Sequence, residues 1–251
     1  MLQLHERGSH RYFTFPELDQ IPSFVHAVTH RSVTGVQPLP GPDGPWTASQ
    51  RELMRALDVA ADDLFFLRQM HSDRSIVASG PRPTGLKPPE ADGVIWSRPG
   101  FFPVIRTADC VPVMVIAPEA GVAGAFHAGW RGTCAKVVEK GIELLLNRLG
   151  RRTSRIIATI GPAIRKCCYQ VGSEVREAFE AANHEVGSLF EDDRLDLVAA
   201  NRRQLEKAGI TEILDCGLCT GCRTDLFFSW RKEKTDQRIW SLAGFRPDFG
   251  V

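Results

Sequence analysis

Three residues that lie far apart in the sequence have side chains suited to binding a transition metal: His71, Cys110 and His127. Two imidazoles and one thiolate suit a soft or borderline divalent ion, with zinc first. A set of three protein ligands leaves one coordination position for water or substrate, which is typical of catalytic rather than structural zinc. The spacing does not itself show that the three side chains meet. The alternative is a buried thiol with two hydrogen-bonded histidines.

The seven cysteines include a dense group at Cys216, Cys219 and Cys222. An odd count without an export signal predicts reduced thiols rather than a disulfide framework. Cys-x-x-Cys is a ligand spacing for zinc or iron–sulfur clusters, but no fourth ligand follows at a recognisable distance. We therefore expect no second metal site in this segment. We expect the adjacent Cys167 and Cys168 to be packed or without a role.

Composition fits a water-soluble enzyme and argues against several other classes. The chain has 251 residues, of which 43% are hydrophobic and 24% charged, and its net charge is +1. This charge gives no reason to expect nucleic acid or an anionic membrane surface as a partner. No stretch has the apolar length of a membrane span, and residues 1–7 lack the pattern of a signal peptide. A cytoplasmic location is therefore expected.

Short segments rich in β-branched or aromatic residues and bounded by turn residues predict strands around the three candidate ligands. They occupy residues 24–29, 64–67, 93–96, 103–106, 113–116, 122–126, 155–160 and 239–242. Cys110 and His127 then lie near the ends of consecutive strands, and His127 opens the turn into a helix.

Apolar residues recurring every three or four positions predict a helix from Ala135 to about Gly150. Two further helices are expected over 174–182 and 195–208, and a capping box at Ser49–Glu52 predicts another that runs through Leu57. Strands followed by helices, without regular alternation, predict an α+β fold with mixed β-sheets packed against helices. The proline-rich stretch 37–45 reads as a surface loop, so residues 1–251 are expected to form a single domain.

Glycines follow the second candidate histidine, at Gly129 and Gly132. They allow close approach of the backbone to a ligand, and the helix start beside them favours an anion. Arg131 lies between them, so we expect a phosphate or carboxylate near Trp130–Gly132. A plain strand-to-helix turn is the alternative.

Four segments of the chain resemble the laccase-domain (YfiH-like) family, several members of which are described as purine nucleoside phosphorylases. The resemblance runs from about Phe24 to Phe245, and its most specific motifs surround Cys110 and His127. The four segments are Ala91-Asp92-Gly93-Val94, Thr107-Ala108-Asp109-Cys110-Val111-Pro112, His127-Ala128-Gly129-Trp130-Arg131-Gly132 and Ile160-Gly161-Pro162-Ala163-Ile164.

The resemblance implies that His71, Cys110 and His127 bind an active-site metal, with zinc expected and copper as the alternative. It also draws attention to Arg31 and Arg231 as ligands of phosphate, because a planar guanidinium suits bidentate phosphate recognition. The chain departs from the family pattern directly after Arg31, and Lys232 stands where the family has a second arginine.

Two acidic residues, Asp92 and Asp109, belong to the same family motifs. A carboxylate beside a ligating histidine commonly fixes the imidazole tautomer, and it can also act as a general acid or base. For Asp109 the alternative is a turn residue that bonds its own backbone.

The resemblance implies phosphorolysis of adenosine, inosine or methylthioadenosine, together with deamination of adenosine by zinc-activated water. The His-x-Glu and Pro-Cys-x-x-Cys signature of the zinc deaminases is absent, so such deamination would be an independent solution. A small-molecule substrate and a monomeric enzyme are expected.

Two other activities stay open. The family's name implies copper-dependent oxidation of phenols, but multicopper oxidases use paired His-x-His motifs and this chain has none. Hydrolysis of an amide in a peptidoglycan precursor is the other, with either Cys110 or zinc-bound water as the nucleophile. For the metal, we expect about one zinc per chain, lost in Cys110→Ala and unaffected by replacing Cys216 and Cys222 with serine.

Overall fold

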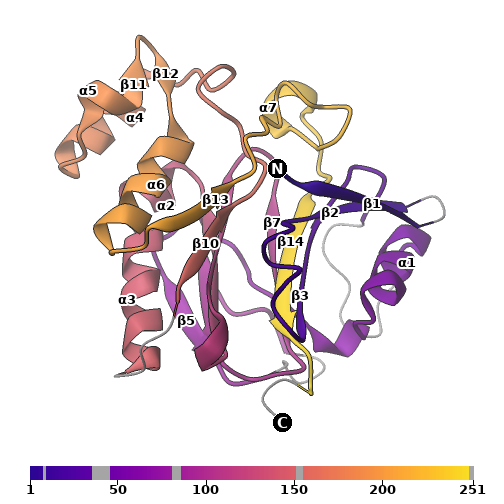
Figure 1. Cartoon of the computed structure of the whole chain (residues 1–251). Helices are drawn as coiled ribbons and strands as arrows, with labels where there is room; N and C mark the ends of the chain where they lie inside the picture. Colours follow the sequence, from indigo (N-terminus) through magenta and orange to yellow (C-terminus); the bar gives the residue numbers. More distant parts are fainter. Residues whose placement is uncertain (8–9, 36–45, 81–85, 151–154, 249–251) are drawn as a thin grey trace.

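The structure is a computed structural model that describes residues 1–7, 10–35, 46–80, 86–150 and 155–248. Two six-stranded mixed β-sheets form its centre (Figure 1). The first sheet has the order β1-β2-β3-β14-β7-β4, in which only the β4–β7 pairing is parallel. Its strands are β1 (Gln3–Arg7), β2 (His10–Thr14), β3 (Phe24–Thr29), β4 (Leu64–Phe66), β7 (Phe102–Thr107) and β14 (Ile239–Phe245).

The second sheet has the order β13-β10-β8-β9-β6-β5. The β5–β6 and β10–β13 pairings are parallel, and the three central pairings are antiparallel. Its strands are β5 (Ser75–Ala78), β6 (Gly93–Trp96), β8 (Val111–Ala117), β9 (Val122–Ala128), β10 (Ile157–Ile160) and β13 (Glu212–Asp215).

Helices cover the outer faces of both sheets. The outer face of the first sheet packs against α1 (Ala48–Leu57), and that of the second packs against α3 (Val137–Leu149) and α6 (Leu197–Lys207). In Figure 1, α1 lies on the right, and α3 and α6 lie together on the left. The remaining short elements are α2 (Trp130–Cys134), α4 (Ser173–Ala181), α5 (Val186–Leu189), α7 (Trp230–Glu233), the hairpin β11 (Phe190–Glu191) and β12 (Arg194–Leu195), and the 3-10 turns at Ala61–Asp63 and Pro118–Ala120.

Alternation along the strands explains this layered arrangement. In β8, Val113 and Val115 face the helices, whereas Met114 and Ile116 face the first sheet. Successive side chains of a strand point to opposite faces, so a strand that is buried on both faces is apolar throughout. His127 shares the parity of Ala123 and Ala125 in β9, which places its side chain on the side between the sheets.

The expected α+β fold with mixed sheets is confirmed, and β3 has the predicted bounds. The predicted helix from Ala135 is wrong at its start, because the chain forms α2, breaks at Lys136 with a positive φ of 65°, and then forms α3. The capping box of α1 consists of Thr47 and Gln50 rather than Ser49 and Glu52. Strands β1, β2, β5 and β13 were not predicted. The stretch 37–45 lies outside the described residues.

Within the described part of the chain, no helix combines the length and the apolar character that crossing a membrane requires.

Candidate metal centre and its cavity

The three candidate ligands come from three segments that the sheets bring to one place. Residue His71 lies in the turn between β4 and β5, Cys110 between β7 and β8, and His127 near the end of β9. Antiparallel pairing of β8 with β9 sets Pro112 opposite His127, which puts the start of one strand beside the end of the other. Cys110, in the loop just before β8, therefore lies close to His127, near the end of β9, because of the register between these two strands.

The distances within this group fit a mononuclear metal. Ligand atoms of His71, Cys110 and His127 all lie within 4.8 Å of one another. Sγ of Cys110 is 3.8 Å from Nε2 of His71, and the two imidazole rings meet edge to face with centroids 4.8 Å apart. Tetrahedral zinc with ordinary Zn–S and Zn–N bonds separates sulfur from nitrogen by about 3.6 Å. Both the donor atoms and their spacing suit zinc, with one coordination position left open.

Asp92 supports two of the three candidate ligands through hydrogen bonds. Its buried carboxylate accepts a hydrogen bond from Nδ1 of His127 at 2.8 Å, which leaves Nε2 of that ring for the metal. The same carboxylate accepts from the backbone N–H groups of Met70, His71 and Ser72. These contacts hold the His71 turn, where φ is +60°. One carboxylate thus positions two of the three ligands, as is usual for carboxylates that support ligating histidines.

Electrostatics favour a thiolate at the centre. Burial would raise the pKa of Cys110, but the charge of His127 and hydrogen bonds from both histidines bring this pKa below its usual value. Burial likewise would lower the pKa of His127, and the neighbouring Cys110 and Asp92 raise it instead. For Asp92, burial is outweighed by hydrogen bonds from His127 and Ser72, which lower its pKa to about 2. The thiolate is the form of cysteine that binds metal.

Gly129 lies against the group and has no room for a side chain. A Cβ atom there would come within 2.7 Å of Cδ2 of His71 and 3.1 Å of Sγ of Cys110. The glycine after β9 is therefore required by the packing of two ligands.

A cavity of about 580 Å³ opens above the three ligands. This volume lies in the range of small-molecule sites. Three aromatic side chains and four arginines stand out in its wall. The lining residues are Gln69, His71, Arg106, Thr107, Ala108, Asp109, Cys110, His127, Trp130, Arg131, Tyr169, Trp230, Arg231 and Arg238.

The arginines make the cavity suited to an anion. Burial and the nearby charge of Arg238 lower the pKa of Arg106 to about 10. Two like charges held close together repel, and an anion between them relieves that repulsion. Arg131 lies over the ring of Trp130 at 4.2 Å, and Arg231 over that of Tyr169 at 5.2 Å.

Asp109 lies in the same wall, but its carboxylate bonds groups other than the two imidazoles. It accepts from Oγ1 of Thr220 and Oγ of Ser229, both at 2.7 Å, and from the backbone N–H of Arg231 at 2.6 Å. The partner that orients an imidazole is Asp92, whereas Asp109 fastens the segment leading into α7 to the metal loop.

The structure does not bring Arg31 to the cavity. Its guanidinium pairs with Glu233 at 2.9 Å, donates to the carbonyl of Thr224 and lies over the ring of Phe228. These contacts hold α7 to the body of the protein, and Arg31 does not line the cavity, so they favour Arg131 and Arg231 over Arg31 as the phosphate ligands.

Sequence reasoning overlooked Arg106, Gln69, Tyr169 and Trp230. Arg106 carried a usable signal, since a charge inside the apolar strand β7 has to find a polar environment. The side-chain amide of Gln69 donates to the backbone carbonyl of Arg106 at 2.7 Å and accepts from the backbone N–H of Arg106 at 2.9 Å. Tyr169 lies in the loop between β10 and α4, outside the four family segments, and nothing in its local sequence marks it. Trp230 is the first residue of α7 and precedes Arg231, so its place beside a candidate phosphate ligand was an available signal.

The fold and the site together define a class: a two-sheet α+β protein with a three-ligand metal group beneath an arginine-lined cavity. The family model described as multi-copper polyphenol oxidoreductase laccase matches residues 46–246. The chain therefore belongs to this laccase-domain family, in which YfiH proteins are found.

Named relatives and a solved structure agree with this assignment. The chain is 37% identical to a purine nucleoside phosphorylase of Deinococcus radiodurans, over 80% of this chain and 77% of the relative. It is 34% identical to adenosine deaminase RL5 from an unknown prokaryotic organism, over 72% and 74% of the two chains. The crystal structure of hypothetical protein YfiH from Bacillus licheniformis superposes with a TM-score of 0.84 at 25% identity, covering 97% of this chain and 99% of that one.

Proposed function

We propose that this protein is a metal-dependent purine nucleoside enzyme. It cleaves adenosine, inosine or methylthioadenosine by phosphorolysis and also deaminates adenosine. The observation that carries the proposal is the position of the His71–Cys110–His127 group in the wall of a cavity that also offers arginines and aromatic rings. The names of the relatives, which include a phosphorylase and a deaminase, support it.

The cavity supplies the contacts that a nucleoside and a phosphate need. Flat aromatic side chains at Trp130, Tyr169 and Trp230 can stack on a purine. Guanidinium groups bind phosphate through paired charge-assisted hydrogen bonds, and we assign this role to Arg131 and Arg231 with the Arg106–Arg238 pair behind them. Such contacts hold the dianion beside the anomeric carbon of the ribose, where it displaces the base.

Zinc bound to the three ligands would supply Lewis-acid chemistry and make water a better nucleophile near neutral pH. Asp92 keeps His127 in the tautomer that presents Nε2, and it holds the His71 turn in place. Asp109, which is engaged with three donors, positions the wall of the cavity in this proposal and does not transfer a proton.

The oxidase alternative requires several copper ions held mainly by imidazoles. Among the described residues, two groups of ligating side chains are close enough to hold a metal, and only His71–Cys110–His127 contains imidazole. The amide hydrolase alternative would use Cys110 or metal-activated water as nucleophile, and it gives the four arginines of the cavity no particular role.

The test is an assay of zinc-loaded protein with adenosine, inosine and methylthioadenosine, each with and without phosphate, followed by product chromatography. We expect free base and a sugar 1-phosphate only when phosphate is present, the sugar being ribose for adenosine and inosine and 5-methylthioribose for methylthioadenosine. Inosine plus ammonia is expected from adenosine in either case. A phenol substrate with copper-loaded protein forms the comparison arm. Oxidation of the phenol without any nucleoside turnover would overturn the proposal.

A further inference from the structure

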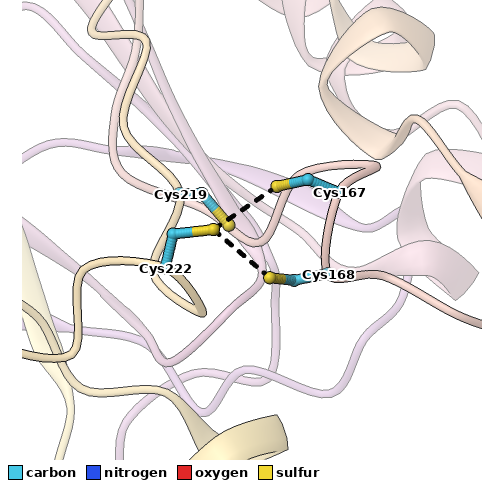
Figure 2. Close-up of side chains that lie close together, drawn as sticks. All are labelled: Cys167, Cys168, Cys219 and Cys222. Atoms are coloured by element: carbon cyan, nitrogen blue, oxygen red, sulfur yellow. Dashed lines mark hydrogen bonds between the residues drawn. The ribbon is translucent and has the colours of Figure 1, made fainter.

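A second group of ligating side chains lies outside the cavity. Figure 2 shows the sulfurs of Cys167, Cys168, Cys219 and Cys222 pointing toward one another. All four sulfurs lie within 4.8 Å of one another, and that of Cys222 is 3.6 Å from Cys167 and 3.4 Å from Cys168. Three cysteines cannot close a tetrahedral site, but these four can.

We propose that these four cysteines bind a structural zinc ion, separate from the metal centre of the cavity. Zinc with four thiolates at ordinary bond lengths places the sulfurs about 3.8 Å apart, close to the observed separations. An iron–sulfur cluster binds its cysteines through different iron atoms, so its cysteine sulfurs lie farther apart than those bound to a single ion. The spacing therefore favours one ion with a closed, all-sulfur coordination shell.

The surroundings of the group suit a metal–thiolate centre. The backbone N–H of Arg165 donates to Sγ of Cys219 at 3.4 Å, a contact that favours the thiolate form. Arg194 donates to the carbonyl of Cys167, which brings a positive charge near a centre that would carry two negative ones. Cys219 is buried, while Cys167 and Cys222 are exposed and leave a path for the ion to enter.

Gly221 makes the close packing of the two cysteine pairs possible. A Cβ atom at this position would lie 3.0 Å from Cβ and 3.1 Å from Sγ of Cys168. The glycine within the Cys219–Cys222 turn lets the loop that carries Cys168 approach this turn closely. The four sulfurs therefore lie close together.

Such an ion would tie together two loops that contribute to the cavity. Cys167 and Cys168 lie between β10 and α4, and Cys219 and Cys222 lie between β13 and α7. The parallel pairing of β10 with β13 brings these loops to the same end of the sheet. Tyr169 follows directly after the first pair and lines the cavity. Thr220, within the second pair, donates to Asp109.

The proposal replaces the expected one zinc per chain with two, and the geometry corrects two other expectations from the sequence. The Cys-x-x-Cys turn does have further ligands, but they precede it by more than fifty residues. Cys167 and Cys168 are members of the group, whereas Cys216 is not: its buried sulfur accepts instead from the N–H of Leu218.

The first test is the zinc content of the full-length protein, by elemental analysis and native mass spectrometry. We expect two zinc ions in the wild type and in the control variant Cys216→Ser. One is expected in Cys222→Ser, which keeps the cavity ion, and one in Cys110→Ala, which keeps the four-cysteine ion. Because zinc content is independent of turnover, this test stands even if the nucleoside proposal fails.

A second measurement does not depend on the folding of a cysteine-to-serine variant in the group. X-ray absorption spectroscopy of Cys110→Ala is expected to show the remaining zinc bound only by sulfur at about 2.3 Å. Nitrogen or oxygen ligands in that spectrum would overturn the proposal. It would also be overturned if the wild type, after incubation with excess zinc, held one zinc ion and its four cysteines reacted as free thiols or were found as disulfides.

Discussion

The two ligand groups of this protein differ in number, chemistry and surroundings. His71, Cys110 and His127 form a mixed set of three, fixed by Asp92 and facing a cavity of about 580 Å³. The four-cysteine group consists of sulfur alone and joins two loops. A three-ligand set leaves a coordination position for chemistry, whereas four thiolates saturate a tetrahedral ion.

The difference also shows in what supports each group. A buried carboxylate orients the ligands of the cavity group, and residues around it bear charges that can bind an anion. The four-cysteine group is held by backbone contacts, such as the N–H of Arg165 on Cys219, and by a glycine turn. The two groups therefore differ in their support as the proposed reactive and structural centres would.

Replacing the glycine beside each group gives the largest expected contrast. In Gly129→Ala the new methyl group collides with His71 and Cys110, so these ligands have to move. A ligand displacement of this kind costs about a hundredfold in turnover, for phosphorolysis and deamination alike. Steady-state kinetics check this result, with Gly221→Ala as the matched variant that stays within about threefold of wild type. Wild-type rates in Gly129→Ala would refute the placement of the centre.

Next in size is the effect of removing one carboxylate charge without changing its shape. Asp92→Asn is expected to weaken zinc binding at the cavity group by roughly ten- to hundredfold, because His127 and the His71 turn lose their common acceptor. Competition with a chromophoric chelator measures this affinity. Asp109→Asn serves as the control, since it is expected to keep zinc affinity and to raise the KM for the nucleoside. Equal zinc affinities in the two variants would show that Asp92 does not support the metal.

A narrower effect is expected at the arginines. Arg231→Ala removes a charge-assisted contact worth roughly 1.5–3 kcal/mol, which corresponds to a ten- to hundredfold loss of phosphorolysis at low phosphate. Deamination uses water, so it should fall much less. Arg31→Ala is the matched control, because Arg31 lies outside the cavity and is paired with Glu233. If Arg231→Ala lost both activities equally with its zinc intact, the arginine would not serve phosphate.

The smallest effect on turnover is expected in the four-cysteine group. Cys222→Ser should lower the melting temperature by at least about 3 °C, since losing the ion removes about 1 kcal/mol or more of stability. The KM for the nucleoside should rise by less than about fivefold through looser placement of Tyr169, with kcat unchanged. Thermal unfolding and a KM–kcat comparison measure both changes. An unchanged melting temperature would mean that the loops need no ion.

Local patterns were sufficient for much of the fold and for the ligands of the cavity. Strand β3 has its predicted bounds because a run of β-branched and aromatic residues between turns fits few other structures. His71, Cys110 and His127 could be selected because their residue types suit zinc and their motifs resemble a family. The helix break at Lys136 could not be predicted, because the periodicity of apolar residues continues across it.

Contacts between distant segments account for the rest. Cys167 and Cys168 meet Cys219 and Cys222 only because β10 pairs with β13, a pairing that no local pattern reveals. The pairing of Arg31 with Glu233 was hidden for a similar reason, since the two residues lie about two hundred positions apart. A residue's type suggests its chemistry, but register and loop placement decide whether it reaches the site.

The most direct test of the central claim measures turnover and zinc content together in Cys110→Ala. The account predicts that this variant keeps one zinc ion, in the four-cysteine group, and unfolds cooperatively. It also predicts that phosphorolysis and deamination both fall by about a thousandfold or more, because the several kcal/mol that the cavity metal supplies are lost. A Cys110→Ala protein that retained two zinc ions and turned over adenosine within tenfold of the wild-type rate would contradict the account.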